Sequence, residues 1–199
     1  MNSMDHTIAD RSEWPDGKTR CRWANPKNER YIRYHDEEWG VPVQEDQKLF
    51  EMLILECFQA GLSWECVLNK RDAFRDAFDS FDPEKVCSYD AEKLETLRNN
   101  PGIIRNRLKI QAAVTNARAF RDIQRECGSF SAYLWHWTDG RTIYENARTS
   151  SPLSDAVSKD LKKRGMKFVG STVIYAYLQA VGIIDFHCPE CHLFRAYDR

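Results

Sequence analysis

The chain has no long apolar run. None of its 199 residues belongs to a stretch approaching the ~18 consecutive apolar residues that a membrane-spanning helix needs. The first ten residues, Met-Asn-Ser-Met-Asp-His-Thr-Ile-Ala-Asp, lack the apolar segment of a secretory signal peptide. The sequence therefore predicts a soluble, cytoplasmic protein with no membrane partner.

An excess of charge of one sign is also missing. Lysine and arginine number 29, aspartate and glutamate number 30, and the net charge is -1. The total charge therefore gives no argument for a polyanionic partner, and any such binding must come from local basic patches. The seven cysteines form an odd set with irregular spacing, which argues against the disulfide framework of a secreted domain.

Internal repeats, low-complexity tracts and paired alternating β patterns are absent, whereas helical signals follow one another closely. Apolar residues at positions 49, 50, 53, 54 and 57 mark one face of a helix that Gly61 ends. We expect further helices over 63–78, 90–98, 103–125, 129–137, 154–164 and 172–181, and another that begins at 82–84. Ser63, Ser154 and Ser171 are the expected caps of three of them. The sequence predicts an all-α protein, with residues 1–18 as a disordered or loosely attached tail and 19–199 as a single domain.

One carboxylate, Glu56, stands inside an otherwise apolar stretch that runs from Met52 to Trp64. A carboxylate held among apolar side chains costs several kcal/mol unless a partner satisfies it. Glu56 is therefore either paired with a basic side chain elsewhere in the chain or a group that awaits a ligand. Residue type alone leaves both interpretations open.

Aromatic residues gather in sequence around His35, among charged neighbours: Trp23, Tyr31, Tyr34 and Trp39. Such rings are often only the amphipathic rim of a core. The alternative is a pocket that sandwiches a planar ligand. If Trp64 and these rings converge on Glu56, the pocket offers flat faces and one hydrogen-bond acceptor, which suits a purine, especially a cationic one.

Cysteine and histidine occur together near both ends of the chain, at Cys21 and His35 and again at His187, Cys188, Cys191 and His192. Zinc takes four nitrogen or sulfur ligands in a tetrahedron, and Cys21, His35, His187 and Cys191 would supply two of each. Two alternatives stay open. Residues 188–192 match the attachment pattern of a c-type haem, although that chemistry requires export, and the thiols and imidazoles could also carry no ligand.

Basic side chains surround a turn at Pro101 and Gly102. Residues 98–121 contain no acid and six bases: Arg98, Arg105, Arg107, Lys109, Arg118 and Arg121. A glycine-containing turn that leads into a helix exposes backbone N–H groups, which accept phosphate. A second basic stretch covers 159–167. Charge runs of this length are usually solvated helix faces, so the turn gives the first stretch more weight.

Five segments in this order resemble the 3-methyladenine DNA glycosylase I (Tag) family: Arg20-Cys21-Arg22-Trp23, the residues of 31–40, Leu55-Glu56 through Trp64, Gly102-Ile103-Ile104-Arg105, and the residues of 162–170. The resemblance covers about Arg20 to Cys191. It implies a divergent helix-hairpin-helix DNA glycosylase fold. It also implies one structural zinc ion that joins the two ends through Cys21, His35, His187 and Cys191, although Cys188 and His192 add possible alternative ligands.

The resemblance further implies an enzyme that hydrolyses the N-glycosidic bond of 3-methyladenine in double-stranded alkylated DNA and leaves an abasic site. The implied base pocket consists of Glu56, Tyr34 and Trp64, lined by Trp23, Tyr31 and Trp39, with Glu56 as the catalytic candidate. The expected DNA contacts are Leu62, Pro101, Gly102, Arg105 and Lys109, with Leu62 as an apolar wedge.

One residue of the pocket region departs from the pattern of the family. Cys57 stands where members of the family often have glycine and could trim the pocket. We expect the protein to act as a monomer. The rival hypothesis is a non-catalytic, zinc-stabilised module that binds damaged DNA without cutting it.

Overall fold

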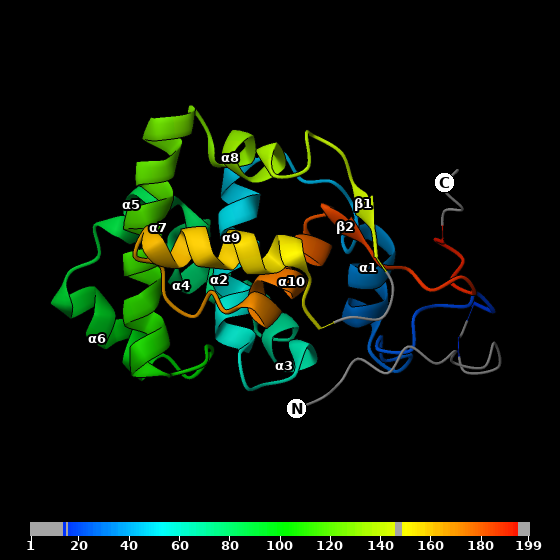
Figure 1. Ribbon diagram of the computed structural model, residues 1–199. Coiled ribbons are helices and arrows are strands. Elements are labelled where there is room, and N and C mark those ends of the chain that lie inside the picture. The colour runs from blue at the N-terminus through cyan, green and yellow to red at the C-terminus, as the bar shows by residue number, and fades with distance from the viewer. Residues whose placement is uncertain (1–13, 15, 146–148, 195–199) are drawn as a thin grey trace.

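The computed structural model describes residue 14, residues 16–145 and residues 149–194, and these are mostly helical (Figure 1). The helices are α1 (Glu29–Glu37), α2 (Asp46–Gln59), α3 (Trp64–Leu68), α4 (Arg71–Ala77), the 3-10 helix η2 (Asp79–Phe81), α5 (Pro83–Cys87), α6 (Ala91–Asn99), α7 (Arg107–Cys127), α8 (Phe130–His136), α9 (Pro152–Lys163) and α10 (Ser171–Ala180). The predicted helical class is confirmed. Within the described part, no helix is both long enough and apolar enough to span a bilayer.

Helix α2 lies in the middle of the fold, behind α9 and α10 in Figure 1. Every side chain from position 49 to 58 is buried, so α2 is covered on all faces rather than on one stripe. The neighbours that cover it include α3, α7, α8 and α10. A polar side chain on this helix therefore faces protein whichever way it points, and this gives Glu56 its importance.

Helix α1 was missed by the sequence analysis because its residues are mostly polar. Asn28 caps it by accepting from the backbone N–H groups of Arg30 and Tyr31. Its buried residues are Tyr31, Tyr34 and His35, at the i, i+3, i+4 spacing of a single helix face. Aromatic rings and an imidazole, rather than aliphatic side chains, form the buried stripe of this helix.

Several predicted helix boundaries were wrong. The helix expected over 63–78 is two helices, α3 and α4, although Ser63 does cap the first of them by accepting from the N–H of Cys66. The helix expected from 103 begins at Arg107, because the Asn106 side chain caps it.

The caps of the last two helices also differ from the prediction. Ser151, and not Ser154, caps α9, in a capping box that the two serines share. Helix α10 follows Gly170, so Ser171 is its first residue and not its cap.

The two ends of the described chain meet at one side of the molecule, where the blue and red segments of Figure 1 approach each other. The carbonyl of Thr19 accepts a hydrogen bond from the backbone N–H of His192 at 2.9 Å. A short parallel pair that the sequence did not indicate, β1 (Ile143–Tyr144) with β2 (Ile184–Asp185), lies just before the last segment. The fold thus brings the cysteine- and histidine-containing ends together.

The tail prediction for residues 1–18 concerns mainly residues 1–13 and 15, which lie outside the described residues. Trp14 is buried in a small cluster with Ala24, and its ring lies 5.0 Å from the guanidinium carbon of Arg20. Asp16 forms an ion pair with Arg20. The end of the predicted tail therefore packs against the domain.

Candidate active site and metal site

Helix α2 carries two buried carboxylates with opposite surroundings. Glu51 accepts from Arg71 at 2.8 Å and from Arg75 at 2.7 Å. Burial alone would raise the pKa of Glu51, but these two guanidinium groups hold it at about 2. Glu56 is only 3% exposed, and its Oε2 has no hydrogen-bond partner among the described residues. Burial raises the pKa of Glu56 to about 8. Of the two interpretations left open by the sequence, the structure supports the group that awaits a ligand.

Glu56 borders a narrow hollow. The hollow is lined by Trp23, Tyr31, Tyr34, Trp39, Glu56, Gln59, Trp64, Ala176 and Gln179. The structure therefore brings together all six residues that we expected in a base pocket. Trp64 reaches the hollow because the chain turns at Gly61, which has a φ of +82°, and enters α3 through its Ser63 cap.

The aromatic rings around the hollow form a connected cluster. The ring centroids of Tyr34 and Trp64 are 5.2 Å apart, and the Trp23 centroid lies 5.4 Å from that of Tyr31 and 4.7 Å from that of Trp39. The indole N–H groups of Trp23 and Trp64 are buried and, like Glu56 Oε2, have no partner in the described part of the chain. Buried polar atoms are rarely left unpaired. Several such atoms around one hollow indicate a site for a flat, polar ligand.

Three residues of the hollow were not predicted: Gln59, Ala176 and Gln179. Ala176 and Gln179 come from α10, more than a hundred residues after α2. A signal for Gln179 does exist in the sequence, because it is a single amide near the end of the otherwise mostly apolar segment Ser171–Ala180. Cys57, which we expected to trim the pocket, does not line the hollow. Its Sγ instead lies 3.6 Å from Asn116 Nδ2.

Three of the four expected metal ligands lie together. One ligand atom each from Cys21, His35 and Cys191 falls within 4.8 Å of the others, and all three residues are buried. Cys191 Sγ lies 3.6 Å from His35 Nε2. A hydrogen bond from Cys21 lowers the pKa of the Cys191 thiol, which favours its thiolate form.

His187, the fourth expected ligand, is adjacent to this group. Its ring centroid is 5.3 Å from that of His35, and its Nε2 is buried with no partner within the described ranges. Asp185 Oδ1 lies 2.9 Å from its Nδ1, and Asp36 Oδ1 lies 2.8 Å from Nδ1 of His35. A carboxylate on Nδ1 fixes the tautomer that leaves Nε2 free for a metal ion. Two cysteine sulfurs and two such imidazoles fit the chemistry of zinc.

Two further observations bear on this metal group. Gly40 makes room for His187, since a Cβ on Gly40 would lie 2.9 Å from its Cε1. Cys188 Sγ lies 3.8 Å from Cys21 Sγ, whereas Nδ1 of His192 lies 2.9 Å from the Thr19 carbonyl. Cys188 Sγ therefore lies beside the expected ligand Cys21, whereas Nδ1 of His192 lies within hydrogen-bond distance of a backbone carbonyl.

Ion pairs of Arg20 support the expected metal ligand His35. Arg20 is 1% exposed, and its guanidinium donates to both carboxylate oxygens of Asp36 at 2.8 and 2.6 Å. The same guanidinium donates to Asp16 at 2.9 and 2.7 Å. Asp36 is also the partner of His35, so Arg20 fixes the carboxylate that orients this imidazole.

The turn between α6 and α7 is held by a hydrogen bond within it and by two from Lys70, which lies earlier in the chain. The Asn100 side chain accepts from the N–H of Gly102 at 2.8 Å, and Lys70 Nζ donates to the carbonyls of Pro101 and Gly102 at 3.3 Å each. A Cβ on Gly102 would lie 3.0 Å from Ala73 Cβ, so only glycine fits without displacement. Arg105 is exposed just beyond the turn.

Lys109 is a correction to the expected DNA contacts. The side chain is only 7% exposed, and its ammonium donates to the carbonyls of Phe58 at 2.8 Å and Ala60 at 2.5 Å. These carbonyls belong to the end of α2, where backbone acceptors have no partner inside the helix. Lys109 therefore caps α2 and holds the turn that leads to Trp64, and it does not face a phosphate.

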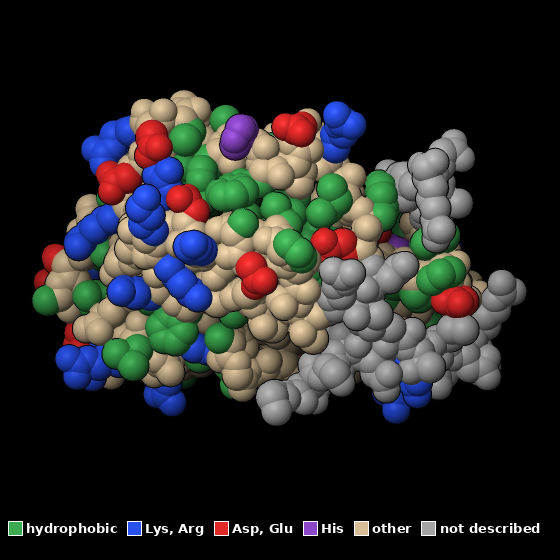
Figure 2. Space-filling model, in the orientation of Figure 1, with side chains coloured by type: hydrophobic (Ala, Val, Ile, Leu, Met, Phe, Trp, Pro, Cys, Tyr) green, Lys and Arg blue, Asp and Glu red, His purple; other side chains and the backbone are tan. Residues whose placement is uncertain are grey.

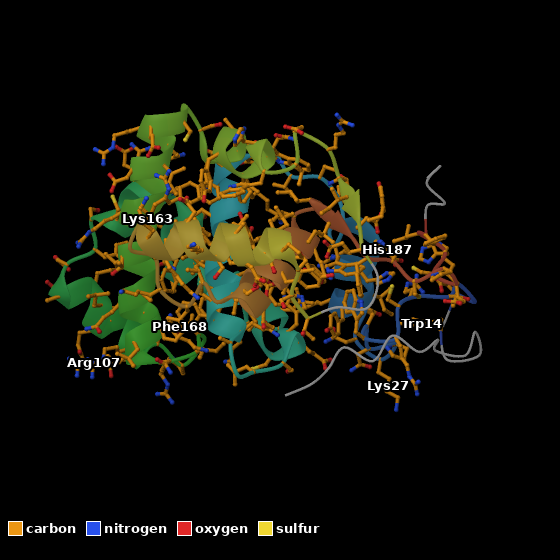
Figure 3. The ribbon with its side chains drawn as sticks, viewed as in Figure 1. Trp14, Lys27, Arg107, Lys163, Phe168 and His187 are labelled. Atoms are coloured by element: carbon orange, nitrogen blue, oxygen red, sulfur yellow. The ribbon has the colours of Figure 1, made fainter. Side chains whose placement is uncertain are left out.

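Three of the exposed apolar side chains come from the turn after α2, from the start of α7 and from the segment after α9. Leu62 is 42% exposed on the turn between Gln59 and Trp64, two residues of the hollow. Leu108 and Phe168 are also exposed. Arg107 and Phe168 lie near the lower end of α7 in Figure 3, and Figure 2 shows lysine and arginine gathered over the part of the face that carries α7 and α9.

The chain matches the family model described as methyladenine glycosylase over residues 23–195. DNA-3-methyladenine glycosylase 1 of Escherichia coli (strain K12) is 44% identical over 178 residues, which are 86% of this chain and 95% of that protein. A crystal structure of 3-methyladenine DNA glycosylase I has a TM-score of 0.85 at 44% identity and covers 88% of this chain and 100% of that one. A structure of 3-methyladenine DNA glycosylase I from Staphylococcus aureus, described as the basis of 3-methyladenine recognition, has a TM-score of 0.83 at 34% identity, over 86% and 95% of the two chains. The matched residues include all those that line the hollow.

Proposed function

Because the chain belongs to the methyladenine glycosylase family, we propose that it excises 3-methyladenine from alkylated DNA by hydrolysing the N-glycosidic bond, which leaves an abasic site. The observation that carries this proposal is the unpaired carboxyl of Glu56 in a hollow walled by aromatic rings. A flat cation supplies what both features lack. The rings offer it their faces, and the carboxyl offers it a counter-charge and an acceptor.

Recognition begins with the removal of the target base from the duplex. The hollow lies inside the fold, so it can receive a base only after that base has rotated out of the stack. Methylation at N3 makes the purine of the nucleotide cationic, and the base therefore departs as a neutral molecule. The bond is already weakened, and modest stabilisation by the protein is enough to break it.

Glu56 is the acceptor for the exocyclic amino group of the adenine. With the hollow empty, the raised pKa keeps this carboxyl neutral near pH 7, and a cationic ring beside it favours the carboxylate. Guanine has a carbonyl where adenine has the amino group, so it would face the carboxylate with a second acceptor. Unmodified adenine lacks the charge and loses the attraction to the rings of Tyr34 and Trp64.

The turn between α6 and α7 acts as the hairpin of a helix-hairpin-helix unit that holds the DNA backbone. The exposed Arg105 contacts a phosphate beside Pro101 and Gly102, while the N–H of Gly102 stays bonded to Asn100 and keeps the turn in shape. Leu62 fills the gap that the everted base leaves in the duplex. Its exposure, on a turn whose two ends both line the hollow, supports this role. We propose that residues 19–199 act as a single domain and that the protein binds double-stranded DNA as a monomer.

Cys21, His35, His187 and Cys191 would hold one structural zinc ion. The ion would tie the two ends of the chain together and leave the chemistry of the hollow to other residues. Support comes from the buried group of three ligand atoms, from the unpaired Nε2 of His187 and from the carboxylates behind both imidazoles. Both cysteines of the 188–191 segment turn toward Cys21, which does not fit covalent attachment to a haem.

Chromatography of the bases released from methylated DNA tests the function. We expect 3-methyladenine in the supernatant and abasic sites in the DNA, with no strand cleavage by the protein itself. A protein that retains methylated DNA on a filter but releases no base would be the non-catalytic damage-binding module instead.

A further inference from the structure

Gln179 is a buried amide in the wall of the hollow. It comes from α10, whereas Glu56 comes from α2, so the two side chains reach the hollow from different helices. Gln179 is 2% exposed. An amide this deeply buried is unfavourable unless it is hydrogen-bonded, and a methionine of similar shape would avoid the cost.

The side-chain amide of Gln179 makes no hydrogen bond to residues 14, 16–145 and 149–194 and is not among the fully enclosed unpaired groups, so it is open to the hollow that it lines, and its backbone is firmly held. Its carbonyl accepts from the N–H of Gly40 at 3.0 Å and from that of Gly182 at 3.2 Å. Gly40 follows Trp39, another residue of the hollow. The amide is therefore positioned by a fixed helix end and is free to bond to an occupant of the hollow.

The other amide of the wall is already engaged. Gln59 Nε2 donates to the carbonyl of Leu62 at 3.4 Å, and so it belongs to the turn after α2. Glu56 can only accept once it is ionised. Gln179 is thus the carboxamide that is left to donate to the edge of a base.

We propose that Gln179 reads the edge of the everted base together with Glu56. Glu56 accepts from the exocyclic amino group of adenine, and the carboxamide of Gln179 donates to a ring nitrogen next to that group, N1 or N7. A single glutamine reads adenine in a DNA groove through the same acceptor-and-donor pattern. Here the two halves of the pattern are divided between two helices. This inference rests on the proposed function.

Binding of the free base isolates this contact from binding of DNA. The probes are 3-methyladenine and its 1-deaza and 7-deaza analogues, each of which lacks one of the two nitrogens. Quenching of the tryptophan fluorescence of the hollow reports occupancy. We expect the parent protein to bind one analogue about 10-fold more weakly than 3-methyladenine, as befits the loss of one buried hydrogen bond.

The variant is Gln179→Met, and Gln111→Met is its matched control, because Gln111 is exposed on α7 away from the hollow. Gln179→Met should bind 3-methyladenine about 10-fold more weakly than the parent and should no longer distinguish it from that analogue. Gln111→Met should match the parent. A loss of equal size for all three bases would mean that Gln179 only shapes the wall, and it would overturn the proposal.

Two further outcomes keep this inference separate from the function. If the parent binds 3-methyladenine and both analogues equally, no ring nitrogen is read. The inference then fails whether or not Gln179→Met folds. If the parent releases no 3-methyladenine from methylated DNA, the proposed function itself fails. Release by the parent with unchanged base binding by Gln179→Met overturns the role of Gln179 alone.

Discussion

Replacing Glu56 by glutamine should stabilise the free protein and change how its stability depends on pH. Burial raises the pKa of Glu56 from 4.5 in the unfolded chain to about 8 in the folded protein. The folded protein therefore keeps a proton that the unfolded chain releases. Because the folded-state pKa is the higher one, this group's contribution is fully present below pH 4.5 and is lost as the pH rises through about 8.

The size of the effect follows from the width of this window. Each pH unit inside it lowers the free energy of unfolding by about 1.4 kcal/mol. The parent should therefore lose roughly 3 kcal/mol by pH 7 and roughly 5 kcal/mol above pH 8 relative to a protein with a neutral side chain at this position. Solvent screening does not reduce these values much, since Glu56 is 3% exposed.

Urea unfolding of the parent and of Glu56→Gln across this pH range measures the difference directly, and subtraction removes the titration of all other groups. The advantage of the variant should grow from under about 1 kcal/mol at pH 5 to about 5 kcal/mol at pH 9. Glu45→Gln is the matched control, because Glu45 is exposed and makes no side-chain hydrogen bond at the start of α2. If the curves of parent and Glu56→Gln ran parallel over the whole range, Glu56 would not be an unpaired buried carboxyl.

Three further predictions concern the expected zinc ligand Cys21, the helix cap Lys109 and the exposed Arg105. Cys21→Ala should lose bound zinc and melt at a lower temperature than the parent, as metal analysis and a melting curve would show; a parent without zinc and an unchanged melting curve would remove the metal proposal. Lys109→Met should lower the free energy of unfolding by about 2 kcal/mol, because it leaves the carbonyls of Phe58 and Ala60 unpaired; urea unfolding at equal stability would contradict the capping role. Arg105→Met should reduce the slope of log K against log salt for DNA binding by about 0.9, whereas Lys109→Met should leave that slope unchanged; equal slopes for Arg105→Met and the parent would place Arg105 outside the DNA interface.

The sequence predicted the residues of the hollow better than it predicted the surroundings of Lys109. A single acid in an apolar helix and rings beside a histidine are local signals, and the fold joins them because α1, α2 and α3 are close in the sequence. Gln179 had a similar signal, but its place in the hollow depends on how α10 packs against α2, which is long-range information. Lys109 could not be assigned from a charge run, because a lysine that caps a buried helix end and one that meets a phosphate look alike in sequence.

The expected metal ligands show the same division between local signals and long-range packing. The residue types at the two ends indicated zinc, but the sequence could not reveal the role of Arg20, whose ion pairs with Asp16 and Asp36 exist only after the ends have folded. The boundary errors at 63–78 and 103–125 have a common cause. Caps formed by single side chains, as at Asn106, end a helix wherever the chain provides them, even inside a stretch with helical periodicity.

The most direct measurement of the central claim is the single-turnover rate of 3-methyladenine release from methylated DNA by Glu56→Gln, with Glu45→Gln beside it. The account predicts that Glu56→Gln releases the base at least about 10-fold more slowly than the parent, since a charge-assisted hydrogen bond to the base is lost, while its melting temperature does not fall. Release at the parent rate by a folded Glu56→Gln would contradict the claim that this carboxyl receives the methylated base.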